Sequence, residues 1–201
     1  MNRRKFLTSS ATSLAAVAVL TVVPLTLTGC DTSWIQTAID DLPTIDTILQ
    51  SVAAIALDAT GNGILDVAAQ AIIQAAVGTA TVALNAVETA IAAYKANPSA
   101  STLADINAAL ISLQPQLTSI LSAVYIKDPA LIATISGAVN LAISVIASIQ
   151  LLLPSASASV ALKAQQPVKL LKPSEIAAQF NVLVTTNGYG KHKIPRRFLG
   201  F

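Results

Sequence analysis

Residues 103–124, LADINAALISLQPQLTSILSAV, decide the fold class of this chain. Their apolar positions alternate between spacings of three and four, which is the period of an amphipathic helix. These positions are Leu103, Ile106, Leu110, Leu113, Leu117, Ile120 and Val124. The pattern keeps its phase through Pro115, so we predict one helix with a bend at the proline rather than two helices. Thr102 with Asp105 is the predicted cap.

The same three-four spacing of apolar residues recurs in three other segments, roughly Ser33 to Leu57, Ile64 to Ala96, and Pro129 to Leu153. We expect Pro43 to open the main part of the first, and Asp128 to cap the last. The connections are short, and each contains Gly or Pro: Gly61-Asn62-Gly63, Asn97-Pro98-Ser99 and Lys127-Asp128-Pro129. Short connections make neighbouring helices antiparallel. We therefore predict an all-α fold, an up-down antiparallel four-helix bundle over residues 30–153.

The composition changes after Pro154. Residues 154–173 are rich in Ser, Ala, Lys and Pro and are predicted to be a linker. Residues 174–201 are predicted to be a short helix and a basic tail. The helix, Ser174 to Val184, would place Ile176, Phe180 and Leu183 on one face. We expect His192, between Lys191 and Lys193, to be solvated.

Charge is divided unevenly along the chain. Residues 31–154 hold nine acids and two bases, whereas residues 155–201 hold seven bases and one acid. A basic tail either lies on the acidic body or contacts something anionic. Four residues are the candidates for contact with an anionic surface: Lys191, Lys193, Arg196 and Arg197.

The composition also leaves a membrane-spanning fold open. The chain is 54% hydrophobic and 11% charged, with a mean hydropathy of +0.67. Residues 130–153 contain no charge, and 24 residues are enough to cross a bilayer. Charged residues interrupt the second and third helices at Asp66, Glu88, Lys95 and Asp105. These interruptions favour a water-soluble domain over a spanning one.

The N-terminus has the layout of an export signal: Arg3-Arg4-Lys5-Phe6-Leu7, an apolar stretch up to Leu27, then Leu27-Thr28-Gly29-Cys30. The first motif resembles the twin-arginine signal of bacteria. The second resembles the lipobox of bacterial lipoproteins. These resemblances imply cleavage of residues 1–29, diacylglycerol on the Cys30 thiol, and a membrane anchor. They place the protein in the cell envelope, on the outer side of the cytoplasmic membrane or at the outer membrane.

Little in the sequence points to catalysis or metal binding. Cys30 is the only cysteine and His192 the only histidine, so an intrachain disulfide and a cysteine-based metal cluster are excluded. The segment from Asp58 to Asp66 resembles the start of an EF-hand loop, but Ala69 stands where the loop needs an acid. We predict a helix–helix turn there, with Asn62-Gly63 supplying a positive φ. Asp40 and Asp41 are assigned a structural role near a helix start.

Together these patterns predict a non-enzymatic lipoprotein that needs no cofactor or metal and has a structural or partner-binding role. Its partners would be the membrane, through Cys30, and an envelope protein, but not nucleic acid. Two alternatives stay open. One is a holin-like or pore-forming membrane protein, and the other is a binder of apolar ligands in a groove between helices. The mature part brings no family resemblance.

Overall fold

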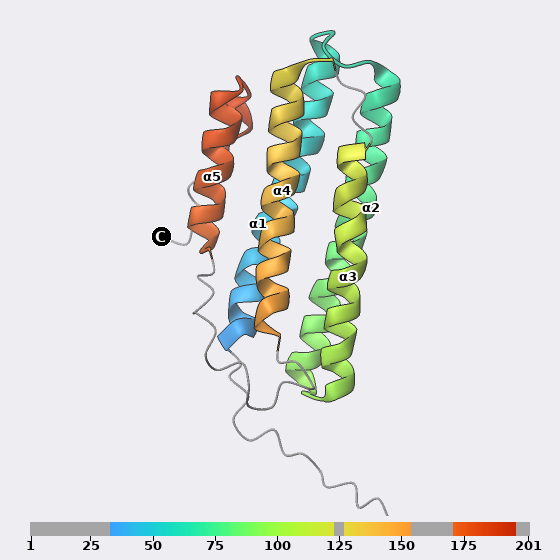
Figure 1. The fold of residues 1–201 in the computed structure, drawn as a ribbon, viewed down its shortest axis with the longest axis vertical. Coiled ribbons are helices and arrows are strands. Elements are labelled where there is room, and N and C mark those ends of the chain that lie inside the picture. Colours follow the sequence, from blue (N-terminus) through green and yellow to red (C-terminus); the bar gives the residue numbers. More distant parts are fainter. Residues whose placement is uncertain (1–32, 123–126, 154–170, 196–201) are drawn as a thin grey trace, which may run out of the picture. The chain divides into compact units, whose positions relative to one another are not determined.

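The described part of the protein, in a computed structural model, comprises residues 33–122, 127–153 and 171–195, and it contains helices and no strand. The elements are α1 (Ser33–Gly61), α2 (Val67–Ala96), α3 (Ala100–Ser122), α4 (Pro129–Leu152), α5 (Pro173–Thr186) and a 3₁₀ turn, η1 (Gly190–His192). The all-α prediction is confirmed (Figure 1). The predicted export signal, the lipobox, most of the linker, Arg196 and Arg197 lie outside the described residues.

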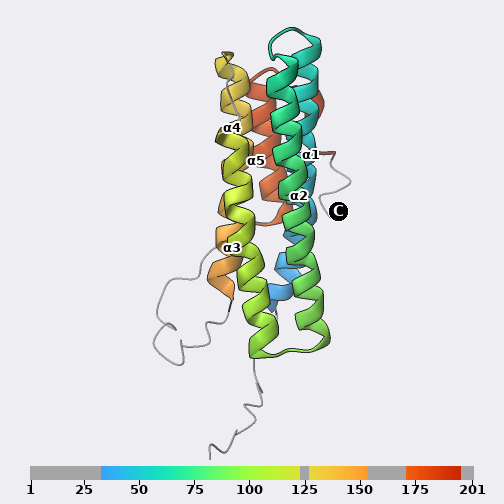
Figure 2. The same ribbon diagram turned by 90° about the vertical axis from the view of Figure 1, so that its right-hand side faces the viewer.

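The long helices pack in consecutive pairs. Helix α1 contacts α2 and α4, and α3 also contacts α2 and α4. Figure 2 shows α2 and α3 running beside each other along their length, and they form the most extensive pair. Helix α5 covers α4 and part of α1, and η1 contacts α5 and α1. Helix α5 and the turn η1 are therefore part of the same packed unit as the four long helices.

The turn between α1 and α2 follows its predicted chemistry. Gly63 has φ of 71°, a conformation that glycine adopts without steric cost. The Asp66 carboxylate accepts a hydrogen bond from the backbone N–H of Ala69 at 2.7 Å and so caps α2. Because Asp66 is the cap, α2 begins at Val67 rather than at Ile64. Before the turn, α1 continues to Gly61, four residues past its predicted end at Leu57.

Both internal prolines lie within continuous helices. Helix α3 passes through Pro115, as predicted. Helix α1 also passes through Pro43, which is ten residues beyond its start at Ser33. The expectation that Pro43 opens the main part of α1 is therefore wrong. The apolar phase on either side of a proline decides whether the helix continues, because packing of the buried stripe offsets one lost hydrogen bond.

The caps of α3 and α4 are set by side chains just before each helix. At α3 the Ser99 hydroxyl accepts from the N–H of Thr102 at 3.2 Å, and the Thr102 hydroxyl accepts from the N–H of Ser99 at 3.1 Å. Ser99, not Thr102 with Asp105, is thus the cap. At α4 the Asp128 carboxylate accepts from the N–H of Leu131 at 2.7 Å, and Pro129 is in the first turn, as predicted.

Helix α5 packs closely against α4. It begins at Pro173, one residue before the predicted start, and its buried residues are Ile176, Ala177, Phe180 and Val184. Leu183 is only half-buried, and it lies over Gly137 of α4. A Cβ on Gly137 would come within 2.8 Å of both terminal methyl groups of Leu183. The missing side chain at Gly137 lets the two helices approach each other.

The core is mostly aliphatic, with the aromatic residues Trp34, Tyr94, Phe180 and Tyr189, and all five helices contribute to it. The predicted stripe of α3 is fully buried from Ile106 to Ile120, whereas Leu103 is partly exposed. The apolar stripe of α2, from Ile73 to Tyr94, is buried as well. Each fully buried Leu or Ile contributes about 1.5–3 kcal/mol relative to an exposed one, so these stripes dominate the stability of the fold.

Candidate functional site

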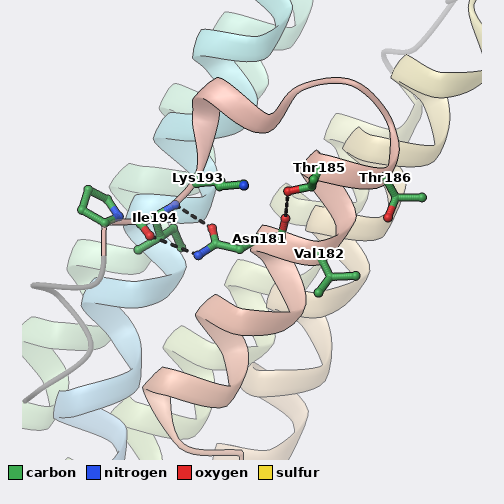
Figure 3. Close-up of a pocket in the computed structure, with 7 residues that line it drawn as sticks. Asn181, Val182, Thr185, Thr186, Lys193 and Ile194 are labelled. Atoms are coloured by element: carbon green, nitrogen blue, oxygen red, sulfur yellow. Dashed lines mark hydrogen bonds between the residues drawn. The ribbon is translucent and has the colours of Figure 1, made fainter.

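A hollow of about 590 Å³ lies between α5 and the segment that follows it (Figure 3). Asn181 closes it at one side, because its amide donates to the carbonyl of Ile194 at 3.1 Å and accepts from the N–H of Ile194 at 2.7 Å. The Thr185 hydroxyl donates to the carbonyl of Asn181 at 2.6 Å. Among the described residues of the lining, Lys193 is the one that is charged. These residues, with the amide of Asn181 and the hydroxyl of Thr185 engaged, offer no nucleophile–base pair.

A second hollow, of about 530 Å³, lies over α1 and reaches α2 and the C-terminal segment. Its acidic side chains are Asp40, Asp46 and Glu88, and the described residues of its lining include no base. The other residues that line it are Pro43, Thr44, Thr47, Gln50, Asn85, Ala177 and Ile194. We call this concave surface the acidic groove. It can attract a cation or a basic chain segment.

Amide side chains on α1 hold two of these acids in place. Gln36 donates to Asp40 at 2.8 Å, and Gln50 donates to Asp46, each from one turn away. The other oxygen of Asp46 is buried and has no hydrogen-bond partner among the described residues. The groove therefore presents fixed carboxylates rather than freely rotating ones.

Asp41, next to Asp40, points into the core instead. Its side chain is 1% exposed, and its Oδ1 has no hydrogen-bond partner within the described residues. Burial, with a smaller contribution from the charge of Asp40, raises the pKa of Asp41 to about 7. The sequence pattern did not identify Asp41 as an unusual carboxyl, although its position in α1 indicates burial. Asp41 stands four residues before Ile45, on the same apolar stripe of α1.

At the far end of α1, Asp58 joins the C-terminal segment to the helix. It forms an ion pair with Lys191, and the His192 Nε2 lies 3.3 Å from its Oδ2. The hydrogen bond from Lys191 has the largest effect on the pKa of Asp58 and holds it below its ordinary value. Desolvation opposes this effect and is second in size, and the hydrogen bond from His192 then lowers the pKa further. The expectation that His192 is solvated is wrong, because its side chain is only 15% exposed.

The EF-hand resemblance does not assemble into a cation site among the described residues. Asp58 is engaged by Lys191 and His192, and Asp66 caps α2. No group of three His, Cys, Asp or Glu side chains in the described ranges lies close enough to hold a metal. The predicted helix–helix turn is what this segment forms.

Two of the four predicted contacts to an anionic surface, Lys191 and Lys193, lie within the described residues. Lys191 is bound to Asp58, and Lys193 borders the hollow of Figure 3. Arg196 and Arg197 fall outside the described residues, as do Arg3, Arg4, Phe6, Leu7 and the lipobox residues Leu27, Thr28, Gly29 and Cys30. Lys191 thus contacts the acidic body, which is one of the two outcomes that the uneven charge predicts.

Three of the described helices are long and apolar enough to cross a membrane: Trp34–Gly61, Val67–Ala96 and Pro129–Leu152. Association with a membrane is compatible with these helices. Length and composition alone do not place them in the bilayer, because a buried helix of a water-soluble domain has the same composition.

No protein-family model, curated protein or solved structure matches the chain.

Proposed function

We propose that this protein is a non-enzymatic lipoprotein of the bacterial cell envelope with a structural or partner-binding role. Lipid on Cys30 holds it at the outer side of the cytoplasmic membrane or at the outer membrane. The twin-arginine-like signal, with Arg3, Arg4, Phe6 and Leu7, directs export, and cleavage at the lipobox removes residues 1–29. The helical domain then works in the aqueous phase beside the membrane.

The observation that carries this proposal is the sorting of side chains around the long helices. The inward stripe of α3 is aliphatic, whereas its outer face exposes Asp105, Asn107, Ser112, Thr118 and Ser119. On α1, Gln36, Asp40 and Gln50 face outward. Polar and ionised groups facing lipid are costly, at roughly 2.5–3.5 kcal/mol for a charge at the centre of a helix. This distribution supports helices that stand in water.

We further propose that α1 to α4 form the up-down antiparallel bundle. The support is the pattern of contacts, in which α1 packs on α2, α2 on α3, α3 on α4, and α4 on α1. The connections between these helices are short, which favours antiparallel neighbours. In this arrangement α5 is an addition to the outside of the bundle.

A membrane-spanning, pore-forming protein is the second candidate. The three long apolar helices support it, and so does the outer face of α2, where Val82 is 69% and Ile72 is 52% exposed. The two candidates differ in one simple property. Residues 31–201, produced without signal and lipid cysteine, should stay in solution without detergent for the lipoprotein and should require detergent for the spanning protein.

The lipid anchor is tested by comparing the full chain with Cys30→Ala. Cells fed labelled palmitate should incorporate the label into the unaltered protein and not into the variant. After alkaline carbonate treatment, the unaltered protein should stay with the membranes. Cys30→Ala also removes the cleavage site, so the signal stays attached and can itself hold the chain in the membrane. The matched sample for extraction therefore carries a cleavable signal without a lipobox in place of residues 1–30. A product that still resists extraction would contradict the proposal and favour the spanning candidate.

A further inference from the structure

The acidic groove has no counter-charge among the described residues. Its acids are Asp40, Asp46 and Glu88, and the amides that hold the first two in place are neutral. None of the three forms an ion pair with a base in the described ranges. Carboxylates gathered along one concave surface repel one another and attract a cationic group.

Two polar groups of the groove also lack hydrogen bonds. Thr44 is 9% exposed, and its hydroxyl has no hydrogen-bond partner within the part of the chain that the structure describes. The buried Oδ1 of Asp46 has none there either. Because buried polar groups in native proteins are almost always hydrogen-bonded, this lining indicates a donor that comes from outside the described residues.

The chain leaves the packed unit at the edge of this groove. Ile194 lines the groove and is 3% exposed. The amide of Asn181 binds both its backbone N–H and its carbonyl, so the point from which the chain continues is fixed (Figure 3). An extended residue spans at most about 3.6 Å, so the Cα atoms of Arg196 and Arg197 lie within about 7 and 11 Å of that of Ile194.

The residues after this point have the chemistry that the groove lacks. Arg196 and Arg197 each carry a planar guanidinium group that can donate two parallel hydrogen bonds to one carboxylate. The same segment already pairs with an acid of α1, since Lys191 is bound to Asp58. Tethering so near the groove raises the effective concentration of the two arginines above that of any free basic segment.

We propose that the acidic groove holds residues 196–201 of the basic tail, with the guanidinium groups of Arg196 and Arg197 against its carboxylates. An outside basic segment reaches the groove only by displacing the tail. All the residues involved belong to one compact unit, Asp31–Phe201, so the proposal does not depend on lipid at Cys30.

Disulfide trapping in the full chain tests the occupant directly. Cys30→Ser removes the native thiol, and Asn85→Cys with Phe198→Cys places one new thiol in the groove and one in the tail. The protein is purified in mild detergent and treated with a mild oxidant. Each thiol's rate with a small neutral disulfide corrects for differences in intrinsic reactivity.

The matched control moves only the partner thiol. Ser112→Cys with Phe198→Cys uses an exposed position on α3, away from the groove. The groove pair is expected to close at least about tenfold faster than this control, because docking raises the effective concentration of one thiol beside the other. The difference should shrink in 1 M salt, where the Debye length falls to about 3 Å.

A third variant tests the role of charge. Arg196→Gln with Arg197→Gln, added to the groove pair, should bring its rate down to that of the control. An unchanged rate would show that tethering, not the guanidinium groups, brings the tail to the groove. Equal rates for the groove and α3 pairs would overturn the proposal outright.

The linker before α5 is the competing occupant within the chain. Ala177 of α5 also lines the groove, and Lys169 stands eight residues before it. Val168→Cys with Asn85→Cys, again with Cys30→Ser, measures its approach. This pair is expected to close more slowly than the tail pair, and a faster closure would assign the groove to the linker instead.

Discussion

Helices α1 and α3 are built on the same three-four spacing, but their buried stripes differ in kind. The stripe of α3 from Ile106 to Ile120 is entirely aliphatic and fully buried. The stripe of α1 includes Asp41, whose carboxyl is as buried as its aliphatic neighbours. Periodicity thus identifies which face of a helix is buried, and the individual residue decides what that burial costs. α3 contributes stability alone, whereas α1 carries a titratable group into the core.

The largest expected effect comes from a cavity in the stripe of α3. Leu113→Ala should lower the free energy of unfolding by about 2–5 kcal/mol, because it removes buried contacts and leaves a void. The neighbouring Ser112→Ala, on the exposed face, is the matched control and should change stability by under about 0.5 kcal/mol. Urea unfolding of residues 31–201 measures both. Equal losses in the two variants would show that α3 does not pack as described.

Asp41 should make stability fall as pH rises. Its pKa is raised from 3.8 to about 7 in the folded protein, so the folded state holds this proton more tightly than the unfolded state. The stabilisation is complete below about pH 4 and is lost as the pH rises to about 7. The shift corresponds to at most about 4 kcal/mol, at 1.36 kcal/mol per pKa unit.

Asp41→Asn tests this dependence. The variant should lose the decline in stability between pH 4 and 7 that the unaltered protein shows, measured by urea unfolding at several pH values. Asp40→Asn, on the exposed side of the same helix, is the matched control and should largely preserve the decline. If the stability of Asp41→Asn depended on pH as that of the unaltered protein does, the Asp41 carboxyl would have to be in water, contrary to the structure.

The internal prolines provide a smaller effect of opposite sign. Pro115→Ala should stabilise α3 by roughly 1–3 kcal/mol, because alanine has higher helix propensity and restores a backbone donor. Pro43→Ala should do the same in α1, since Pro43 is also exposed and internal. Thermal unfolding of the two variants compares them directly. Destabilisation at both sites would mean that the local backbone geometry set by each proline is required for packing.

The smallest effect is expected at the surface ion pair of α1. The pKa of Asp58 is lowered, so its contribution is present above the unfolded pKa near 3.8 and is lost as the pH falls through the lower folded value. Asp58→Asn should lower the melting temperature slightly at pH 7, and the difference should shrink on acidification and in high salt. A difference that grows in acid would contradict the contact with Lys191 and His192.

The helices were predictable because each carries its own local signals. The apolar stripes, the Asp128 cap and the Gly63 turn are all visible within a few residues of sequence. Three features were not predictable in this way. His192 and Lys191 meet Asp58 across more than a hundred residues, Pro43 lies inside a helix because of packing on both sides, and Leu183 fits over Gly137 only once α5 lies on α4.

The candidate sites show the same division. The motifs at residues 1–30 are local and were readable from the sequence, although they lie outside the described residues. The acidic groove is formed by α1, α2, Ala177 of α5 and Ile194 together, so no single stretch of sequence predicts it. Asp41 lies on the predicted stripe, but its position near the predicted helix start indicates a dipole role. The first turn of α1 contains no acid, and Asp41 is instead buried.

The most direct measurement of the central claim is the intact mass of the protein extracted from bacterial membranes. If Cys30 is the lipid anchor, we expect a chain that begins at Cys30 and carries the added mass of a diacylglycerol on the thiol, with or without an acyl group on its amine. A chain in the membrane that still begins at Met1, with an unmodified Cys30, would contradict the lipid anchor and assign membrane association to the helices themselves.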